Sequence, residues 1–310
     1  MEIIRKEYSI PSKTGIGNVY ARCWVPADGV KAVLQIAHGM AEHGERYEDF
    51  ANYLCSFGFA VFVNDHIGHG KSAASDEELG YFGESKGWDA FVEDERAFSE
   101  VIFKEYPATP LIFFGHSMGS FIAREYIRRY GRDERITAAV FCGTSGTNPA
   151  SAMAIKIADT VIKLKGSKHY SKLINNIAFA PYNAKTEKRT AFDWLSTDTA
   201  QVDKYIADKH CGFLFTAAGY KDLFTILTRV SGKDWYREMP EEIPVLLIAG
   251  EDDPVGAYGK GVKQVYNDLI KAGKKDVSLK LYPGMRHEIL NEINNNVVYG
   301  DIAAWAESKI

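Results

Sequence analysis

The segment Gly115-His116-Ser117-Met118-Gly119 places a serine between two glycines, directly after the apolar run Leu111–Phe114. A serine hydroxyl is a weak nucleophile unless the fold exposes it to a base on a sharp turn between a strand and a helix. Glycines permit that turn because they carry no Cβ. An apolar pattern of helical spacing follows the segment. We therefore expect Ser117 to be a nucleophile and the N–H of Met118 to be an oxyanion donor.

A base and an acid should follow at the ends of later strands, because parallel sheets present their chemistry at the carboxyl ends of the strands. The buried-strand pattern Pro244–Gly250 runs into two adjacent acids, Asp252 and Asp253. The pattern Ser278–Gly284 is followed by His287. His287 is expected to take the serine proton, and one of the two acids to orient its imidazole. The other acid is interpreted as a turn residue or a helix N-cap.

The loop after the earlier strand pattern Ala32–Ala37 is expected to supply a second oxyanion donor. Met40 lies at the position whose backbone N–H would face the oxyanion. His38, in the same loop, precedes a glycine and is interpreted as a hydrogen-bonded structural residue. These expectations together predict acyl transfer through a serine, a histidine and an acid.

Four segments resemble the α/β-hydrolase superfamily, in its monoglyceride lipase and lysophospholipase branch. They are HGMAEHGERY (38–47), DHIGHGKS (65–72), GHSMG (115–119) and GEDDPV (250–255). The acid of that family is third after the glycine of the last motif, which implies Asp253. Ser120 departs from the pattern, since the branch commonly has another glycine there. This departure should loosen the fit of the helix to the turn without changing the catalytic assignment.

Strand and helix patterns alternate along most of the chain and predict a doubly wound, mostly parallel sheet. Two antiparallel strands are expected first, at Ile3–Ile10 and Val19–Val25. About a hundred residues separate the strand pattern ending at Cys142 from the one beginning at Val245, far more than an ordinary connection. We therefore predict a core of residues 1–143 and 236–310 with an inserted helical cap, residues 144–235, before the penultimate strand.

The predicted cap contains an amphipathic helix, Ser151–Leu164, followed by a basic segment. Such a helix could dock on lipid aggregates or a membrane surface. The alternative is that its apolar face packs within the cap and its lysines are solvated. Apolar residues further along the insert suit a site that removes an acyl chain from water.

Composition excludes several classes of function. The chain has 310 residues, 46% of them hydrophobic, and a formal charge of -4, which argues against nucleic-acid binding. No apolar run reaches the length of a membrane span and the first residues are too charged for a signal peptide, so a cytoplasmic enzyme is expected. The four separated cysteines are interpreted as reduced packing residues.

Two other patterns, one like a P-loop and one like a metal site, are excluded by the spacing of their residues. Gly68–Ser72 lacks the first glycine of a P-loop, because Asp65 occupies that position. The histidines at 38, 43, 66 and 69 do not form a helical i, i+4 pair, so no metal site is expected there. The loop from Asp65 to Ser72 is instead expected to satisfy turn amides with its polar side chains. No cofactor and no metal are expected.

These observations predict a serine carboxylester hydrolase with Ser117, His287 and Asp253 as the triad, and Met40 and Met118 as oxyanion donors. The resemblance implies monoacylglycerol or lysophospholipid as the small-molecule ester substrate. Two alternatives remain. The same triad could pass the acyl group to another acceptor or cleave a thioester or amide, or the fold could bind a ligand without turnover.

Overall fold

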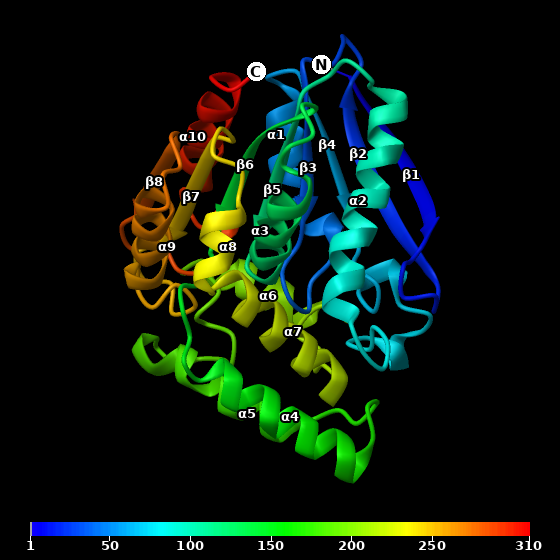
Figure 1. Ribbon diagram of the computed structural model, residues 1–310, viewed down its shortest axis with the longest axis vertical. Coiled ribbons are helices and arrows are strands. Elements are labelled where there is room, and N and C mark those ends of the chain that lie inside the picture. Colours follow the sequence, from blue (N-terminus) through cyan, green and yellow to red (C-terminus); the bar gives the residue numbers. More distant parts are fainter. Residues whose placement is uncertain (1) are drawn as a thin grey trace.

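The computed structural model describes residues 2–310 and is built around one eight-stranded sheet (Figure 1). The strand order is β1-β2-β4-β3-β5-β6-β7-β8. β1 and β2 form an antiparallel hairpin and β2 pairs antiparallel with β4, whereas all later neighbours are parallel. The strands are β1 (Ile3–Pro11), β2 (Asn18–Pro26), β3 (Ala32–Ala37), β4 (Phe59–Asn64), β5 (Leu111–His116), β6 (Ile136–Cys142), β7 (Val245–Gly250) and β8 (Val277–Tyr282). This is the doubly wound, mostly parallel sheet that the sequence predicts.

Helices cover both faces of the sheet because the central strands are apolar on both faces. In β5, Leu111 and Phe113 face one core, and Ile112 and Phe114 face the other. The first core is covered by α2 (Gly87–Glu105), α3 (Met118–Tyr130) and α9 (Lys260–Lys271). The second is covered by α1 (Glu48–Cys55) and α10 (Asn295–Glu307). Short 3-10 turns complete the connections: η1 (Gly44–Tyr47), η2 (Gly70–Ser72), η3 (Asp76–Glu78) and η5 (Ile289–Asn291).

The long connection between β6 and β7 is helical, and Figure 1 shows its first helices at the bottom of the view, apart from the sheet. It contains α4 (Ser151–Lys165), α5 (Lys172–Phe179), η4 (Ala180–Lys185), α6 (Thr199–Ala207), α7 (Ala217–Val230) and α8 (Lys233–Glu238). Its helix α4 packs on α7, and α7 in turn packs on α2 and α3. Within residues 2–310, no helix combines the length and the apolarity that crossing a bilayer requires.

Both ends of this insert are held by α3, the helix that follows Ser117. The buried Arg124 of α3 donates to the backbone oxygens of Ser145 and Val230, at the two ends of the insert. The indole of Trp235, in α8, donates to the Arg124 backbone oxygen at 2.8 Å. The boundaries 144 and 235 between cap and core therefore stay a prediction, and the second of them falls inside a helix that packs on α3.

Candidate active site

Ser117 lies on the turn between β5 and α3, in a backbone conformation that side chains rarely adopt. Its φ is 54° and its ψ is -120°. A residue held in this strained region needs surrounding structure to fix it, and such positions gather at functional sites. The Ser117 N–H donates to the backbone oxygen of Cys142 in the neighbouring strand at 2.9 Å, which helps to fix the turn.

Gly115 and Gly119, two residues before and after Ser117, are needed because other backbone atoms lie where a Cβ would be. A Cβ on Gly115 would lie 2.2 Å from the backbone oxygen of Gly119, and a Cβ on Gly119 would lie 2.0 Å from that of Ala37. Ser120 is accommodated differently from our expectation. Its hydroxyl is buried and donates to the Ser117 backbone oxygen at 2.6 Å, so the extra side chain adds a hydrogen bond to the turn.

His287 and Asp253 meet at the carboxyl edge of the sheet. The Nδ1 of His287 lies 3.0 Å from Oδ1 of Asp253, and both side chains are buried. The same carboxylate oxygen accepts the N–H of Val255 at 2.8 Å, which fixes its direction. Asp252 is exposed, and its N–H donates to the backbone oxygen of Met285. The structure thus pairs His287 with Asp253 and directs Asp252 to solvent.

The loop after β3 lies against Ser117. A Cβ on Gly39 would be 3.2 Å from the Ser117 Cβ. The Gly39 N–H is already taken, because it donates to Oε1 of Glu42 at 2.5 Å. The N–H that follows is that of Met40, and both Met40 and Met118 line the same cavity as Ser117 and His287.

A buried charge network that the sequence reasoning did not identify lies behind these groups. Arg46 donates to Oε2 of Glu42 at 2.7 Å and holds Glu288 through two hydrogen bonds of 2.7 and 2.6 Å. Nδ1 of His116 lies 3.2 Å from Oε1 of Glu42, and its Nε2 lies 3.4 Å from the backbone oxygen of His287. The network therefore joins the loop after β3, the residue before Ser117 and the residue after His287.

Charges within the network outweigh the effect of burial on the pKa values of its titratable groups. Burial opposes ionisation of Glu42, but Arg46 and His116 outweigh it and lower the pKa of this carboxyl well below its usual value. Burial likewise opposes ionisation of Glu288, and Arg46 lowers its pKa. For His116, the carboxylate of Glu42 outweighs burial and raises the pKa. Glu42 and Arg46 are four residues apart within the 38–47 motif, a spacing that could have drawn attention to them.

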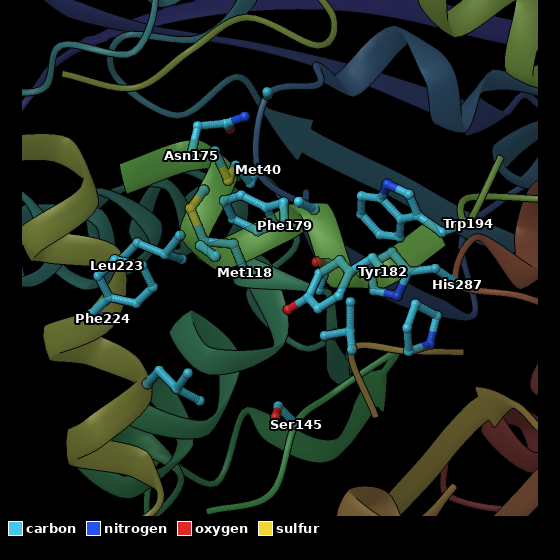
Figure 2. A pocket seen from close by; sticks show the side chains of 18 of the residues that line it. Met40, Met118, Ser145, Asn175, Phe179, Tyr182, Trp194, Leu223, Phe224 and His287 are labelled. Atoms are coloured by element: carbon cyan, nitrogen blue, oxygen red, sulfur yellow. The ribbon is translucent and has the colours of Figure 1, made fainter. Parts of the chain in front are cut away.

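Ser117 and His287 line a cavity of about 770 Å³ between the sheet edge and the insert. Figure 2 shows Tyr182 and Trp194 beside His287, and Leu223 and Phe224 further along the cavity. The insert also touches the histidine through its backbone. The His287 N–H donates to the Trp194 oxygen at 3.4 Å, and the Glu288 N–H to the Leu195 oxygen at 2.7 Å. Sequence reasoning placed the insert above the site but did not find these contacts.

His38, by contrast, has a structural role. Its Nε2 accepts the His66 N–H at 3.0 Å and its Nδ1 lies 2.8 Å from the Gly39 oxygen. Burial lowers the pKa of His38 to about 3, so the ring is neutral. The prediction for the 65–72 loop is also confirmed, since Asp65 accepts the N–H groups of Gly44 and Lys71 at 2.7 and 2.8 Å.

All four cysteines are free and buried.

The sheet order, the turn at Ser117 and the flanking helices define the α/β-hydrolase class. A family model described as serine aminopeptidase, S33, matches residues 28–294, and the chain belongs to this α/β-hydrolase family.

Curated relatives and solved structures support the monoglyceride lipase-like branch. The chain is 29% identical to human monoglyceride lipase over 301 residues, 94% of this chain and 87% of the human protein. It is 30% identical to monoacylglycerol lipase of Mycolicibacterium smegmatis over 311 residues, 99% of this chain and 98% of that protein. A carboxyl esterase from Bacillus coagulans, solved with glycerol, superposes with a TM-score of 0.92 at 30% identity, covering 99% of both chains. The chain is a serine ester hydrolase.

Proposed function

We propose that this enzyme hydrolyses monoacylglycerols through Ser117, His287 and Asp253. The observation that carries the proposal is the strained turn at Ser117, which opens into a cavity also lined by His287, itself bonded to Asp253. A strained serine beside a positioned imidazole is the arrangement that acyl transfer requires.

In the proposed reaction, the Ser117 hydroxyl attacks the ester carbonyl carbon and His287 Nε2 takes its proton. The N–H groups of Met40 and Met118 stabilise the oxyanion of the tetrahedral intermediate. The intermediate collapses as His287 returns the proton to the leaving alcohol, and an acyl-serine remains. Water, deprotonated by His287, then attacks this ester, and the fatty acid leaves as the serine regains its proton. Asp253 holds Nδ1–H of the imidazole throughout.

The cavity supplies an apolar arm for the acyl chain. Leu223, Phe224 and Leu227 of α7 line it together with Ile157 of α4 and Ile174 of α5. Each methylene that leaves water for such a lining contributes about 0.8 kcal/mol. The apolar arm therefore favours a medium or long acyl chain over acetate.

The other end of the cavity favours a neutral alcohol. Glu42 and Glu288 both line it near His287, and both have lowered pKa values, with Arg46 outweighing burial at each. Arg46 is bonded to both carboxylates but does not line the cavity, and no other lysine or arginine among residues 2–310 does. An anionic phosphate headgroup would therefore find no cation to pair with, whereas the hydroxyls of glycerol need none. We therefore favour monoacylglycerol over lysophospholipid. The Bacillus coagulans esterase, whose structure contains glycerol, is a relative consistent with this choice.

Contact with lipid aggregates is also part of the proposal. Met153 and Leu164 of α4 and Leu173 and Ile177 of α5 are exposed, with Leu164 the most exposed at 79%. Lysines of the same segment, Lys156, Lys163, Lys165, Lys168 and Lys172, lie among them in the sequence. Exposed apolar side chains with basic neighbours suit the surface of a lipid aggregate. Ile157 and Val161 of α4 are only half-buried, so the helix serves both the insert and this surface.

The test is a direct comparison of substrates with product analysis. We expect monoacylglycerol to be cleaved to fatty acid and glycerol, with lysophospholipid at least about tenfold slower in kcat/KM. Equal rates would overturn the headgroup argument. Ester products formed with an added alcohol in preference to free acid would indicate an acyltransferase. Turnover of an aminoacyl anilide above that of the esters would indicate an aminopeptidase.

A further inference from the structure

Three side chains of types that bind metal ions meet between the oxyanion loop and the insert. They are His43 of the loop after β3, and Asp208 and Cys211, which follow α6. Their ligand atoms all lie within 4.8 Å of one another, and His43 Nε2 lies 2.9 Å from Asp208 Oδ2. The His43 and Cys211 side chains are buried, and that of Asp208 is 35% exposed. None of the three belongs to the proposed triad or oxyanion hole.

The backbone around the three residues holds them in place. The Cys211 N–H donates to the Asp208 oxygen at 3.0 Å, so a tight turn brings carboxylate and thiol to one side. The next N–H, that of Gly212, donates to the backbone oxygen of Ala41 at 2.9 Å and fastens this turn to the oxyanion loop. Directly after His43, the Gly44 N–H is held by Asp65 at 2.7 Å. The two segments that provide the ligands are thus already joined.

The set of donor atoms identifies the class of metal. One imidazole nitrogen, one thiol sulfur and one carboxylate oxygen suit Zn²⁺ or Co²⁺, whereas Mg²⁺ and Ca²⁺ prefer oxygen alone. At ordinary zinc bond lengths the ligands of a tetrahedral site are about 3.3–3.8 Å apart. Metal binding would therefore open the 2.9 Å contact between His43 and Asp208 slightly and bring any ligand pair near the 4.8 Å limit closer together. The exposed side of Asp208 leaves room for water as the fourth ligand. Burial raises the pKa of the Cys211 thiol, and a bound Zn²⁺ would displace its proton.

We propose that His43, Asp208 and Cys211 form a divalent metal site of the zinc type that ties the insert to the oxyanion loop. The hydrogen bond between His43 and Asp208 accounts for two of the three residues, but it gives no reason for a thiol at the same point. The site lies three residues beyond Met40, so a bound ion would restrain the loop that carries the proposed oxyanion donor. This inference does not depend on the proposed substrate.

Cobalt provides a readout that separates metal binding from catalysis. The whole protein, stripped with a chelator, is titrated with Co²⁺ and its near-ultraviolet and visible absorption recorded. We expect one equivalent to bind, with a thiolate-to-cobalt charge-transfer band that Zn²⁺ abolishes by displacement. We expect the melting temperature to rise with added Zn²⁺. Ser117→Ala, which leaves the three ligands untouched, should bind Co²⁺ as the unaltered protein does.

Matched variants identify the ligands. Cys211→Ser should remove the charge-transfer band and weaken binding at least about tenfold, whereas Cys23→Ser, at another buried thiol, should retain both. Asp208→Asn keeps an oxygen able to accept from His43, so it tests the carboxylate if Cys211→Ser does not fold. Absence of the band in the unaltered protein would overturn the proposal. So would a band that persists at full strength and affinity in Cys211→Ser, or unchanged affinity in Asp208→Asn.

Discussion

The two walls of the cavity differ in how their side chains are held. On the wall formed by the sheet edge, polar groups are buried and paired, as in the bond between His287 and Asp253 and the contacts of Arg46 with Glu42 and Glu288. On the wall formed by the insert, Leu223, Phe224 and Leu227 offer apolar surface without fixed partners of this kind. From this difference we expect the sheet-edge wall to govern the rate of the chemical step and the insert wall to govern the choice of substrate. Changes in the first wall should lower kcat, and changes in the second should alter chain-length preference.

The largest expected effect is at Ser117, the proposed nucleophile. Ser117→Ala should reduce kcat for monoacylglycerol by about 10⁵- to 10⁶-fold, because loss of the triad serine removes most of the chemical rate. The fold should persist, so the melting temperature should stay close to that of the unaltered protein. Ser145→Ala, at another serine that lines the cavity, is the matched control and should keep most of the activity. More than about a tenth of the activity remaining in Ser117→Ala would exclude Ser117 as the nucleophile.

The two neighbouring acids give the next largest contrast. Asp253→Asn should lower kcat by about 10³- to 10⁴-fold, because an amide favours the wrong tautomer of His287. Asp252→Asn should have little effect, since that side chain is exposed. Steady-state kinetics of both variants with one ester measures the contrast. The reverse order of the two losses would assign the triad acid to Asp252.

The charge network should matter for stability more than any surface pair. Arg46→Met leaves Glu42 and Glu288 buried without their cation, which typically costs about 3–5 kcal/mol in the free energy of unfolding. Arg189→Met removes an exposed pair with Asp203 and should cost about 0–1 kcal/mol. Denaturant unfolding of the two variants provides the measurement. Equal losses would mean that the network does not hold the sheet-edge wall in place.

A substitution in the insert wall should change the preference for acyl-chain length and leave the turnover of short esters unchanged. Leu227→Trp narrows the apolar arm, so kcat/KM should stop rising at a shorter acyl chain, while short esters keep their turnover. Up to that point, each methylene should add about fourfold, equivalent to about 0.8 kcal/mol. A series of glycerol esters from acetate to oleate measures this profile. Ile270→Trp, at an exposed position of α9 outside both the cavity lining and the lipid-contact surface, is the control. A profile in Leu227→Trp that matches the control would contradict the role of this wall.

The smallest effect concerns the contact between the insert and α2. Asp222 of α7 accepts the N–H of Gly87 at 3.0 Å, and burial raises its pKa to about 7. A carboxyl with a raised pKa binds its proton more tightly when folded, so its stabilising contribution is complete below about pH 3.8 and is lost as pH rises to about 7.

Asp222→Asn should therefore match the unaltered protein near pH 4 and exceed it in stability above pH 7, by on the order of a few kcal/mol at most. Unfolding measured at several pH values tests this expectation. A constant difference across that range would mean that Asp222 keeps the same protonation state in the folded and unfolded chains.

Sequence patterns predicted the fold because strands and tight turns are determined largely by residues that are neighbours in the sequence. The apolar run at Leu111–Phe114 and the glycines beside Ser117 identify a buried strand and a tight turn without knowledge of distant residues. The pairing of His287 with Asp253 depended on the resemblance, because the residues alone left Asp252 equally open. The Arg46–Glu288 pair joins positions 242 residues apart, and no local pattern indicates such a contact. The same holds for Trp194, whose oxygen meets the His287 N–H across the insert.

The role of Ser117 as the nucleophile is tested most directly by covalent labelling with a fluorophosphonate, followed by intact mass measurement and peptide mapping. We predict one adduct per chain, on Ser117, absent in Ser117→Ala and formed much more slowly in His287→Ala. The unaltered protein should lose monoacylglycerol hydrolysis in proportion to the adduct formed. An adduct on another serine, or complete labelling of Ser117 with hydrolysis undiminished, would contradict the claim that this serine carries the reaction.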